Sequence, residues 1–363
     1  MKKAIQIHQF SPATAVGDGV TSGLFVTQKL LRNIGYESNI YSAYIPPALS
    51  KKVQPVDGLA SEKTDLLLVH HSMGHDHDDL ITSFQCPMAM VYHNITPASF
   101  FAPDTAEHRY AKKGRQQLNQ WSDLFIGAIG DSLYNSEELK DAGYANIITL
   151  PMLIEMEKFH TKTVSAPRDW GLNSSRPRLL SVGRIVENKR QHLLLEAMWY
   201  LKNYHDDITL PQLVIVGGVT SPEYEYSLKA HILKLGLEDD VLMPGKCSDE
   251  ELSWLYQNSD CYWCASEHEG FCMPLIESGF FELPVISFAS SNIPSTLGES
   301  GLIIEQSDPA ILAATTAQLL TNNTLKQALI NAGTRNLNNF QSSTLIPKLS
   351  AYLSSLNPAL TIQ

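Results

Sequence analysis

The sequence predicts two α/β domains, each a doubly wound parallel sheet of the Rossmann-like type. A length of 363 residues fits two domains, each large enough for its own core. Short apolar runs alternate with longer amphipathic stretches, which is the order of β and α units in parallel α/β folds. Runs such as Leu66–Val69 and Leu213–Val216 are continuously apolar. Strands covered by helices on both faces have this pattern.

The individual elements follow from these runs and from the amphipathic stretches between them. The predicted strands are Ala4–Phe10, Asn39–Ala43, Asp65–His70, Met88–Tyr92, Asp123–Ala128, Arg178–Val182, Gln212–Val216, Asp240–Met243, Asp260–Ala265, Pro284–Phe288 and Gly301–Glu305. The predicted helices are Thr21–Ile34, Lys189–Asn203, Pro222–Leu235, Asp249–Asn258, Pro309–Leu320 and Leu325–Gly333. Each helix has apolar residues at helical spacing, so it can cover one face of a sheet.

A polar stretch from Glu155 to Arg178, with prolines and a glycine, predicts the boundary between the domains. We expect a first domain over residues 1–158 and a second over residues 159–338. A C-terminal helix at about 339–363 is expected to pack back on the first domain. In such folds ligands bind at the carboxyl ends of the strands, so a cleft between the domains is the expected site.

The charge and cysteine content exclude several classes of protein. The formal charge of −11 argues against a nucleic-acid partner, since a basic field supplies most of that affinity. An odd number of cysteines, five, and the lack of a secretory signal predict a reducing cytoplasm. No stretch approaches the roughly 20 apolar residues that span a bilayer. The expected location is therefore cytoplasmic, with at most a peripheral contact on the inner face of the cytoplasmic membrane.

The segment Ser266–Glu277 follows a predicted strand and opens a helix. Pro274 suits the first helical position, where a missing N–H has no effect on the hydrogen bonds of the helix. The backbone N–H groups of Phe271, Cys272 and Met273 could then bind hydroxyls or phosphate.

Two carboxylates of the same segment could bind a sugar nucleotide. Glu277 falls about one turn into the helix, where it could accept two hydrogen bonds from a ribose diol. Glu269 lies in the loop, where it could meet a sugar. A capped surface helix with incidental acids is the alternative interpretation.

The segment Ser181–Gln191 is the second motif, and it also joins a strand to a helix. Arg184 offers a planar fork suited to a diphosphate, and Lys189 offers a point charge. Asn188 is expected to cap the helix that begins at Lys189. A basic turn on a solvated surface is the alternative.

Together these motifs carry a family resemblance. Gly183-Arg184 with Asn188-Lys189, then Gly217-Gly218, Pro244-Gly245-Lys246, and Glu269 seven residues before Glu277 stand in this order. The order resembles that of retaining nucleotide-sugar glycosyltransferases of family 4, which have the GT-B fold. The resemblance implies two Rossmann-like domains, an active site between them and no obligatory metal.

The resemblance also implies roles for single residues. Arg184 and Lys189 would bind the donor diphosphate. Glu269 would lie by the donor sugar, and Glu277 would bind ribose. The backbone at Gly245-Lys246 would meet the nucleobase. The family often has a small residue where Cys272 stands, so a larger side chain could narrow the sugar pocket.

The loop Val16–Gly23 joins the first strand to the first helix. Its glycines do not match the dinucleotide fingerprint, and the second strand lacks the acidic residue that binds ribose, which argues against an NAD enzyme. The loop resembles the family's glycine-rich turn, and Gly17 and Gly19 would allow close backbone approach to phosphate. Phosphate would repel Asp18, which is therefore expected to face an acceptor hydroxyl. An ordinary glycine turn is the alternative.

Polar residues after two other predicted strands complete the first domain. His93, in the segment Tyr92–Pro97, looks like the family's histidine beside the donor sugar; a buried structural histidine is the alternative. Ser132 and Asn135 are expected to fix the geometry of the following loop. The histidine-rich segment His70–Asp79 matches no standard metal spacing. It is interpreted as lining the acceptor cleft, with His71 as an acceptor-side residue and no metal.

Two further patterns receive structural interpretations. Cys261 and Cys264 lie in a predicted buried strand, where positions i and i+3 point to opposite faces, so packing is expected rather than redox chemistry. The stretch Ala106–Trp121 carries four basic residues near aromatic ones, including Trp121. A solvated basic helix is the preferred interpretation, and peripheral contact with an anionic membrane is the other.

These inferences combine into one expected function. It is metal-independent, cofactor-free transfer of a hexose, mannose being one candidate, from a nucleotide sugar to a saccharide or lipid-linked acceptor in bacterial O-antigen or capsule synthesis. The expected catalytic residues are Arg184, Lys189, Glu269 and His93. The expected donor-binding residues are Gly17, Gly19, Gly183, Gly245, Lys246, Gly270, Phe271, Cys272, Met273 and Glu277. The alternatives are a non-catalytic sugar-nucleotide binding protein and another GT-B enzyme such as an epimerase or phosphorylase.

Overall fold

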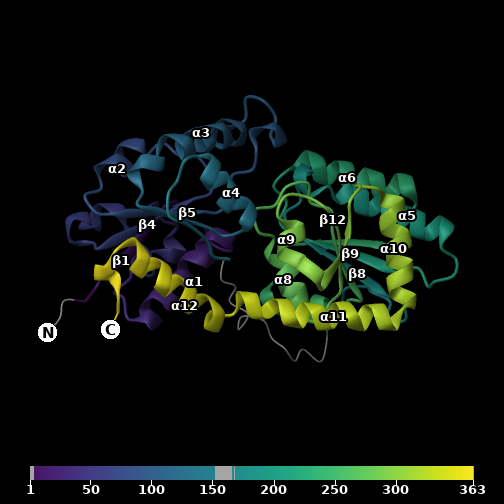
Figure 1. Cartoon of the computed structure of the whole chain (residues 1–363). Helices are drawn as coiled ribbons and strands as arrows, with labels where there is room; N and C mark the ends of the chain where they lie inside the picture. Colours follow the sequence, from purple (N-terminus) through teal and green to yellow (C-terminus); the bar gives the residue numbers. More distant parts are fainter. Residues whose placement is uncertain (1–3, 152–165, 167, 363) are drawn as a thin grey trace. The chain divides into compact units, whose positions relative to one another are not determined.

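A computed structural model of the chain describes residues 4–151, 166 and 168–362. It divides into two compact units, Met1–Ile154 with Asn339–Gln363, and Glu155–Asn338. The boundary predicted between residues 158 and 159 lies outside the described residues. In each unit a parallel sheet is covered by helices on both faces (Figure 1).

The first unit is built on a seven-stranded sheet in the order β3-β2-β1-β4-β5-β6-β7, with every neighbouring pair parallel. Its strands are β1 (Ile7–Ala13), β2 (Ile40–Tyr44), β3 (Gln54–Pro55), β4 (Leu66–His71), β5 (Met88–Tyr92), β6 (Gly127–Gly130) and β7 (Ile147–Thr149). Its helices are α1 (Gly19–Ile34), α2 (Asp78–Ser83), α3 (Ala106–Gln120), α4 (Leu133–Asp141) and α12 (Ser342–Leu356).

The apolar run of β4 shows why this sheet is covered on both faces. Leu66 and Leu68 pack in the core beneath α1 and α12, and Leu67 and Val69 pack in the core beneath α2, α3 and α4. Successive side chains of a strand point to opposite faces, so a continuous apolar run needs two covering layers.

Helix α12 belongs to the first unit although it follows the second in the sequence. Leu345, Leu349 and Leu353 are buried in the core beneath α1. The hydroxyl of Tyr352 donates to the carbonyl oxygens of Ala128 at 3.1 Å and Asn146 at 2.8 Å. Figure 1 shows the yellow α12 beside the purple α1. The C-terminal residues therefore complete one face of the first sheet.

The second unit is built on a six-stranded parallel sheet in the order β10-β9-β8-β11-β12-β13. Its strands are β8 (Arg178–Val182), β9 (Gln212–Val216), β10 (Val241–Gly245), β11 (Cys261–Cys264), β12 (Val285–Phe288) and β13 (Gly301–Ile304). Its helices are α5 (Gln191–Tyr204), α6 (Pro222–Leu235), α7 (Asp249–Gln257), α8 (Met273–Phe280), α9 (Ile293–Leu297), α10 (Pro309–Thr321) and α11 (Asn323–Leu337).

Helices again cover both faces of this sheet. Residues of α5, α6, α10 and α11 share one core with the sheet, and residues of α7, α8 and α9 share the other. Cys261 lies in the first core and Cys264 in the second, as the alternation along β11 requires. The predicted fold class, two Rossmann-like α/β domains, is confirmed.

The sheet topology places a switch point in each unit. In the first unit the strand order runs outward in opposite directions from β1 and β4, and in the second from β8 and β11. At such a point the two neighbouring crossovers lie on opposite faces of the sheet, which opens a crevice at the carboxyl ends of the strands.

The surface gives little sign of a membrane-spanning element. Among the described residues, no helix combines the length and the apolar character needed to cross a bilayer.

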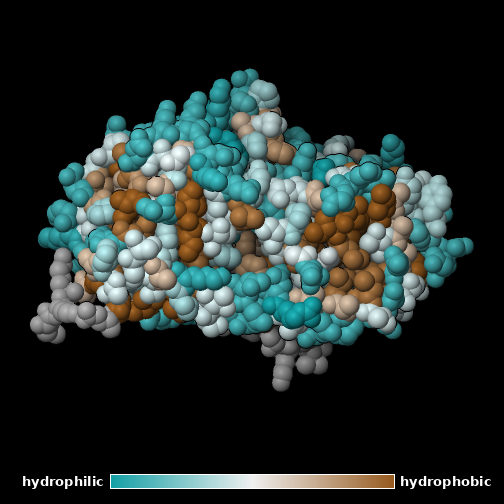
Figure 2. Space-filling model, viewed as in Figure 1, coloured by the Kyte–Doolittle hydropathy of each residue, from teal (hydrophilic) through white to brown (hydrophobic). Residues whose placement is uncertain are grey.

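Figure 2 shows apolar surface on this face of the second unit, in the region where Figure 1 places β12 and α10. An open groove of about 640 Å³ between edge strand β13 and α10 is lined by Leu302, Ile303 and Ile311 among others.

Candidate active site

The switch point of the second unit is assembled from loops that touch closely. A Cβ atom on Gly217 would lie 1.8 Å from the carbonyl oxygen of Gly183, so only glycine fits there. The backbone N–H of Ile185 donates to the carbonyl of Gly218 at 2.9 Å. The loop after β8 therefore lies directly against the loop after β9, as the glycines of the sequence motif require.

Lys189 lies at the end of a short 3₁₀ turn, Glu187–Lys189, that follows β8. The backbone N–H of Glu267 donates to the carbonyl of Asn188 at 2.8 Å, which joins this turn to the loop after β11. That contact brings Lys189 to Glu269, with which it forms a hydrogen-bonded ion pair. The side chains are 18% and 12% exposed.

The ion pair keeps both groups charged in a mostly buried position. Burial alone would lower the pKa of Lys189, but the charge of Glu269, the hydrogen bond to it and the neighbouring cysteines together outweigh burial and raise that pKa. Burial alone would raise the pKa of Glu269, but Lys189 and hydrogen bonds lower it. An anionic ligand that approached Lys189 would therefore meet a fully charged ammonium.

Arg184 is the exposed cation of this switch point. It follows Gly183, and its guanidinium has no hydrogen-bond or ion-pair partner in the part of the chain that the structure describes. Arg190 has a different task, since its side chain donates to the carbonyl of Ala265 at 3.1 Å and to Ser307 at 2.9 Å. Arg184 is thus available to a ligand, whereas Arg190 ties loops together.

The predicted start of the following helix was wrong by two residues. Helix α5 begins at Gln191, and its N-cap residue is Arg190 in the left-handed conformation, with φ of 47°. Asn188 is buried in the 3₁₀ turn and does not cap α5. The helical pattern continues through the turn in sequence, so periodicity alone did not separate the two.

Helix α8 follows the loop as the sequence predicts, but it begins one residue before Pro274, the predicted first helical position. The helix begins at Met273, with Pro274 in its first turn, and Cys272 is the N-cap residue at φ of 67°. The first backbone N–H groups of a helix have no partner within it, so this end can bind hydroxyls or phosphate. Phe271 is buried, and its carbonyl accepts a hydrogen bond from Thr296 at 2.8 Å.

Glu277 lies in the first two turns of α8 and is only 5% exposed. Its carboxylate accepts a hydrogen bond from the hydroxyl of Tyr256 at 2.9 Å. Burial, and then the charge of Glu277, raise the pKa of Tyr256 well above its usual value. The tyrosine therefore stays a donor, and it fixes the orientation of the carboxylate.

The remaining predicted donor residues of this unit lie on its loops. Gly245 ends β10 at φ of 77°, where glycine avoids strain, and Lys246 follows it fully outside the core. Gly270 lies in the turn between Glu269 and α8. All three belong to loops at the carboxyl ends of the strands.

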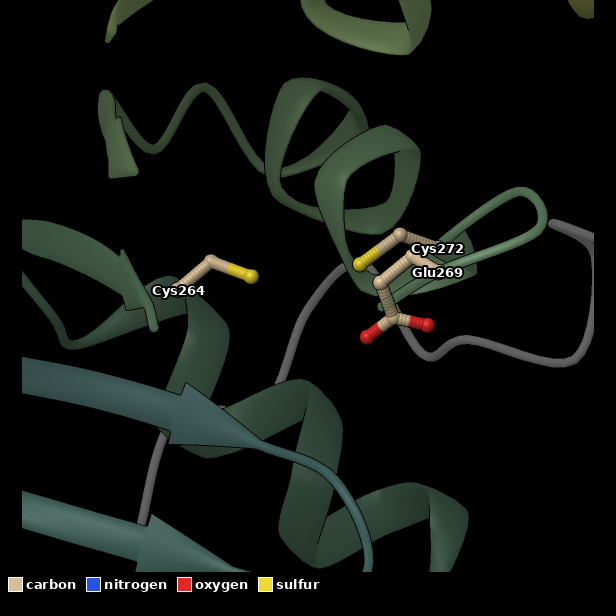
Figure 3. Close-up of side chains that lie close together, drawn as sticks. All are labelled: Cys264, Glu269 and Cys272. Atoms are coloured by element: carbon tan, nitrogen blue, oxygen red, sulfur yellow. The ribbon is translucent and has the colours of Figure 1, made fainter. Parts of the chain in front are cut away.

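Two cysteines and Glu269 converge between β11 and α8. Figure 3 shows the sulfur atoms of Cys264 and Cys272 directed toward one another, with the carboxylate of Glu269 beside Cys272. A hydrogen bond from Cys272 lowers the pKa of the Cys264 thiol to about 7. Cys264 and Cys261 are both buried in apolar cores on opposite faces of the sheet, which agrees with the packing role that the sequence predicts.

The switch point of the first unit carries a row of polar side chains across four neighbouring strands. Gln9 Oε1 lies 3.1 Å from His70 Nε2, and His70 Nδ1 lies 2.8 Å from His93 Nε2. His93 Nδ1 lies 2.9 Å from Asp131 Oδ2. These residues come from β1, β4 and the ends of β5 and β6, so parallel pairing of the strands aligns them.

The row needs one more proton than two neutral rings supply. Gln9 accepts at one end, because its amide N–H₂ is used by the carbonyl of Leu24 at 3.1 Å, and Asp131 accepts at the other. Three hydrogens are therefore needed for the three contacts, and two neutral imidazoles carry two. Burial lowers the pKa of His70 well below its usual value. The row thus places the His93 ring between His70 and the Asp131 carboxylate.

His93 and Asp131 also line a small enclosed cavity. It has a volume of about 40 Å³ and is bordered by Gly23 and Thr27 of α1. The predicted position of His93 after β5 is thus part of a buried polar row with access to a cavity.

The two predicted acceptor-side residues have structural tasks. Asp18 is the N-cap residue of α1, and its carboxylate accepts from the N–H of Thr21 at 2.9 Å. His71 is completely buried and contacts the carbonyl of Gly114 at 3.0 Å, so it does not line an open acceptor surface. Gly17 adopts φ of 77° just before this cap, and Gly19 begins the helix.

The histidine-rich segment and the basic helix are held by local contacts of their own side chains. Within the described residues, His70–Asp79 does not gather three metal-ligand atoms, since its histidines turn into separate contacts. On α3, Lys113 pairs with Asp76 at 2.7 Å and Arg115 with Glu138 at 2.9 Å. Trp121 is buried, so it cannot form an aromatic membrane face.

Some residues of these two sites were not singled out from the sequence. No sequence motif assigns a role to Asp131, Gln9 or Tyr256. Asp131 could have been found because it directly follows a strand adjacent to that of His93. Tyr256 lies on α7, and no local pattern relates it to Glu277.

Comparison with known proteins identifies the second unit. Residues 165–336 match the family model described as glycosyl transferases group 1. This part of the chain thus matches a glycosyltransferase group 1 domain. The match includes both loops that hold Lys189 and Glu269.

Curated relatives of the chain are distant and longer. The chain is 25% identical over 281 residues to a putative colanic acid biosynthesis glycosyltransferase, WcaL, of Salmonella typhimurium, covering 74% of this chain and 64% of that protein. It is 26% identical over 234 residues to a D-inositol 3-phosphate glycosyltransferase of Corynebacterium urealyticum, covering 61% and 55%. The chain thus spans less than two thirds of these relatives.

Solved structures of similar fold include proteins described as glycosyltransferases. The Anabaena protein HepE, in complex with UDP and glucose, has a TM-score of 0.76 at 16% identity, covering 96% of this chain and all of that one. A sucrose-phosphate synthase of Thermosynechococcus elongatus has a TM-score of 0.75 at 17% identity, covering 98% and 100%. The shared GT-B fold agrees with the fold class predicted from the sequence.

Proposed function

We propose that the chain transfers a hexose from a nucleotide diphosphate sugar to a saccharide hydroxyl, with retention of configuration and without an obligatory metal or cofactor. The observation that carries this proposal is the Lys189–Glu269 ion pair at the switch point of the second unit. Exposed Arg184 lies on the same loop as Lys189. A diphosphate could bind both cations, while Glu269 would be released toward the sugar.

The proposed reaction breaks the bond between C1 of the donor sugar and the leaving diphosphate oxygen. A bond forms between C1 and the acceptor oxygen on the same face, and the acceptor proton moves to the leaving diphosphate. Arg184, Lys189 and the N–H groups at the start of α8 would stabilise the negative charge that develops on the diphosphate. Removal of one such contact typically lowers the rate by about 10² to 10³.

The other residues of the two units would position the donor. Glu277, oriented by Tyr256, would bind the ribose diol, and the backbone at Gly245-Lys246 would contact the base. His93 would bind a hydroxyl of the donor sugar. The predicted cleft between the units stays a prediction.

The names of the relatives support a role in glycan synthesis. WcaL is named for colanic acid biosynthesis, and WaaG, a structure of similar fold, is described as involved in lipopolysaccharide biosynthesis. We therefore propose a saccharide or lipid-linked saccharide of a bacterial surface glycan as the acceptor, and the cytoplasm as the location.

Donor binding is the first test. Thermal unfolding of the full chain is measured with UDP-, GDP-, ADP- and dTDP-sugars, since a ligand that binds only the folded state raises the midpoint. We expect one nucleotide class to raise it in the wild type, and less in Arg184→Ala. Arg335→Ala removes an exposed arginine from α11 and is the matched control.

Transfer from the identified donor is the second test. Arg184→Ala should reduce transfer by about 10² or more while the unfolding midpoint stays unchanged. Near-normal transfer by this variant would contradict the proposal. Donor binding without any product, across a panel of saccharide acceptors, would instead favour a non-catalytic binding protein.

A further inference from the structure

Three potential metal ligands meet at the carboxyl end of β11. The Sγ atoms of Cys264 and Cys272 and a carboxylate oxygen of Glu269 all lie within 4.8 Å of one another. Cys264 ends the strand, Cys272 caps α8, and Glu269 lies in the loop between them (Figure 3). One short segment of the chain thus supplies all three atoms.

The donor set and its dimensions suit a thiophilic divalent cation. Zinc binds thiolates at about 2.3 Å and carboxylates at about 2.0–2.2 Å, and two sulfur ligands of a tetrahedral ion are about 3.8 Å apart. The separations in this cluster exceed such values by at most about 1 Å, which a change of side-chain rotamer can supply. Three protein ligands would leave a fourth position for a small ligand.

The neighbouring lysine balances the charge of such a site. Two thiolates and one carboxylate carry three negative charges, and a divalent cation with the Lys189 ammonium carries three positive ones. Both cysteines are buried, at 4% and 8% exposure, so an unbalanced charge there would be costly. Lys189 already contacts Glu269, so it is in place to neutralise the cluster.

The conformation of Cys272 indicates that its side chain is not incidental. It adopts φ of 67°, a left-handed conformation that costs a residue with a Cβ atom about 1–2 kcal/mol. The family pattern described above often has a small residue there. The proposed transfer reaction has no step that needs a sulfur atom.

We propose that Cys264, Glu269 and Cys272 form a binding site for a thiophilic divalent cation of the zinc class, and that the bound cation inhibits transfer. The cation would hold Glu269 in the cluster and away from the donor sugar, and its positive charge would attract both thiolates. The binding part stands on the geometry alone, and the inhibition part rests on the proposed function.

Binding is tested with cobalt(II) as a spectroscopic probe, followed by displacement with zinc. Titration of the full reduced chain should give a one-to-one complex with intense thiolate-to-cobalt absorption and tetrahedral d–d bands. Cys264→Ser should lower the affinity at least about tenfold and reduce the thiolate band. Cys272→Ser should also lower the affinity for cobalt at least about tenfold and reduce the thiolate band.

Matched controls separate this site from general thiol binding. Cys261→Ser removes a buried thiol from the opposite face of the same strand, and Cys247→Ser removes a half-buried thiol elsewhere in the unit. Both should keep the wild-type cobalt spectrum. Unfolding curves confirm that each variant is folded. The proposal is overturned if no one-to-one complex forms at micromolar cobalt, or if Cys264→Ser gives the wild-type spectrum.

Inhibition is tested with micromolar zinc in the transfer assay. Zinc should lower transfer by the wild type and by Cys247→Ser at least about tenfold, and a chelator should restore it. Cys264→Ser should resist, and equal inhibition of this variant would overturn the regulatory part. If transfer fails without zinc while the cobalt spectrum persists, the proposed function is wrong and the cation site stands.

Discussion

The two units place polar side chains at equivalent switch points but use them in opposite ways. In the first unit Gln9, His70, His93 and Asp131 satisfy one another in a closed row of hydrogen bonds. In the second unit an ion pair between loops lies beside an exposed arginine. A closed row fixes geometry, whereas an ion pair beside a free cation can exchange one anion for another. The same topology thus supports a rigid site and a site that can exchange ligands.

The largest expected effect comes from removing the ammonium group of Lys189, whose carboxylate partner a diphosphate is proposed to replace. Lys189→Ala should lower kcat for transfer by about 10² to 10³, because the developing charge of the diphosphate loses a partner. Steady-state kinetics with the identified donor measure this. Lys229→Ala, which breaks an exposed ion pair with Glu225 on α6, should leave kcat within about twofold. A comparable loss in both variants would mean that the effect is not specific to the site.

A smaller effect is expected from opening the closed row. Asp131→Asn removes the carboxylate that lies 2.9 Å from His93 Nδ1, and a hydrogen bond to a charged group contributes about 1.5–3 kcal/mol. Urea unfolding should show a loss of that size. Asp141→Asn, at the exposed end of α4, is the control and should change stability by less than about 0.5 kcal/mol. If Asp131→Asn has the same free energy of unfolding as the wild type, the contact between His93 and Asp131 does not stabilise the fold.

The third prediction concerns pH and is confined to the first unit. Burial lowers the pKa of His71 to about 4 and that of His75 to about 3, below the 6.5 of an exposed histidine. Below pH 6.5 the unfolded chain therefore binds protons that the folded chain does not, and stability is lost as the pH falls. Between pH 7 and pH 5 each ring should account for at most about 2 kcal/mol.

The measurement is urea unfolding of the wild type and of His75→Gln at both pH values. The variant should lose about 2 kcal/mol less than the wild type on acidification. His108→Gln, on the partly exposed side of α3, should behave as the wild type does. An equal loss in the wild type and in His75→Gln would show that His75 is not held neutral.

Elements with a continuous apolar run could be predicted from the sequence, and elements without one could not. Strands β5, β8 and β9 have the predicted bounds, since their residues are buried on both faces. Strand β6 was expected at Asp123–Ala128 but lies at Gly127–Gly130, because Ser122–Leu124 forms a 3₁₀ turn and two glycines weaken the apolar pattern. Strands β3 and β7 have two and three residues, too few for any periodicity.

Features of the candidate site also divide into those that the local sequence predicts and those that depend on contacts between distant residues. The loop position of Glu269 could be predicted, because it lies in the connection that follows a strand of a parallel sheet. Lys189 lies in such a connection too, although the helix was expected to begin at Lys189 itself. Their pairing depends on the contact between Asn188 and Glu267, which are 79 residues apart in the numbered sequence. The burial of His71 likewise depends on neighbours that no local pattern identifies, whereas the cap made by Asp18 is a local contact with Thr21.

Helix α12 has a consequence for the synthesis of the chain. The core beneath α1 cannot close until Leu345, Leu349 and Leu353 have been made, after the whole of the second unit. At about 5–20 residues per second a ribosome needs roughly 10–40 s for that intervening stretch. Throughout this interval the nascent first sheet exposes one apolar face. The first unit is therefore the first to be synthesised but the last to complete its core. Expression of the N-terminal segment without the last helix should accordingly give an aggregating product.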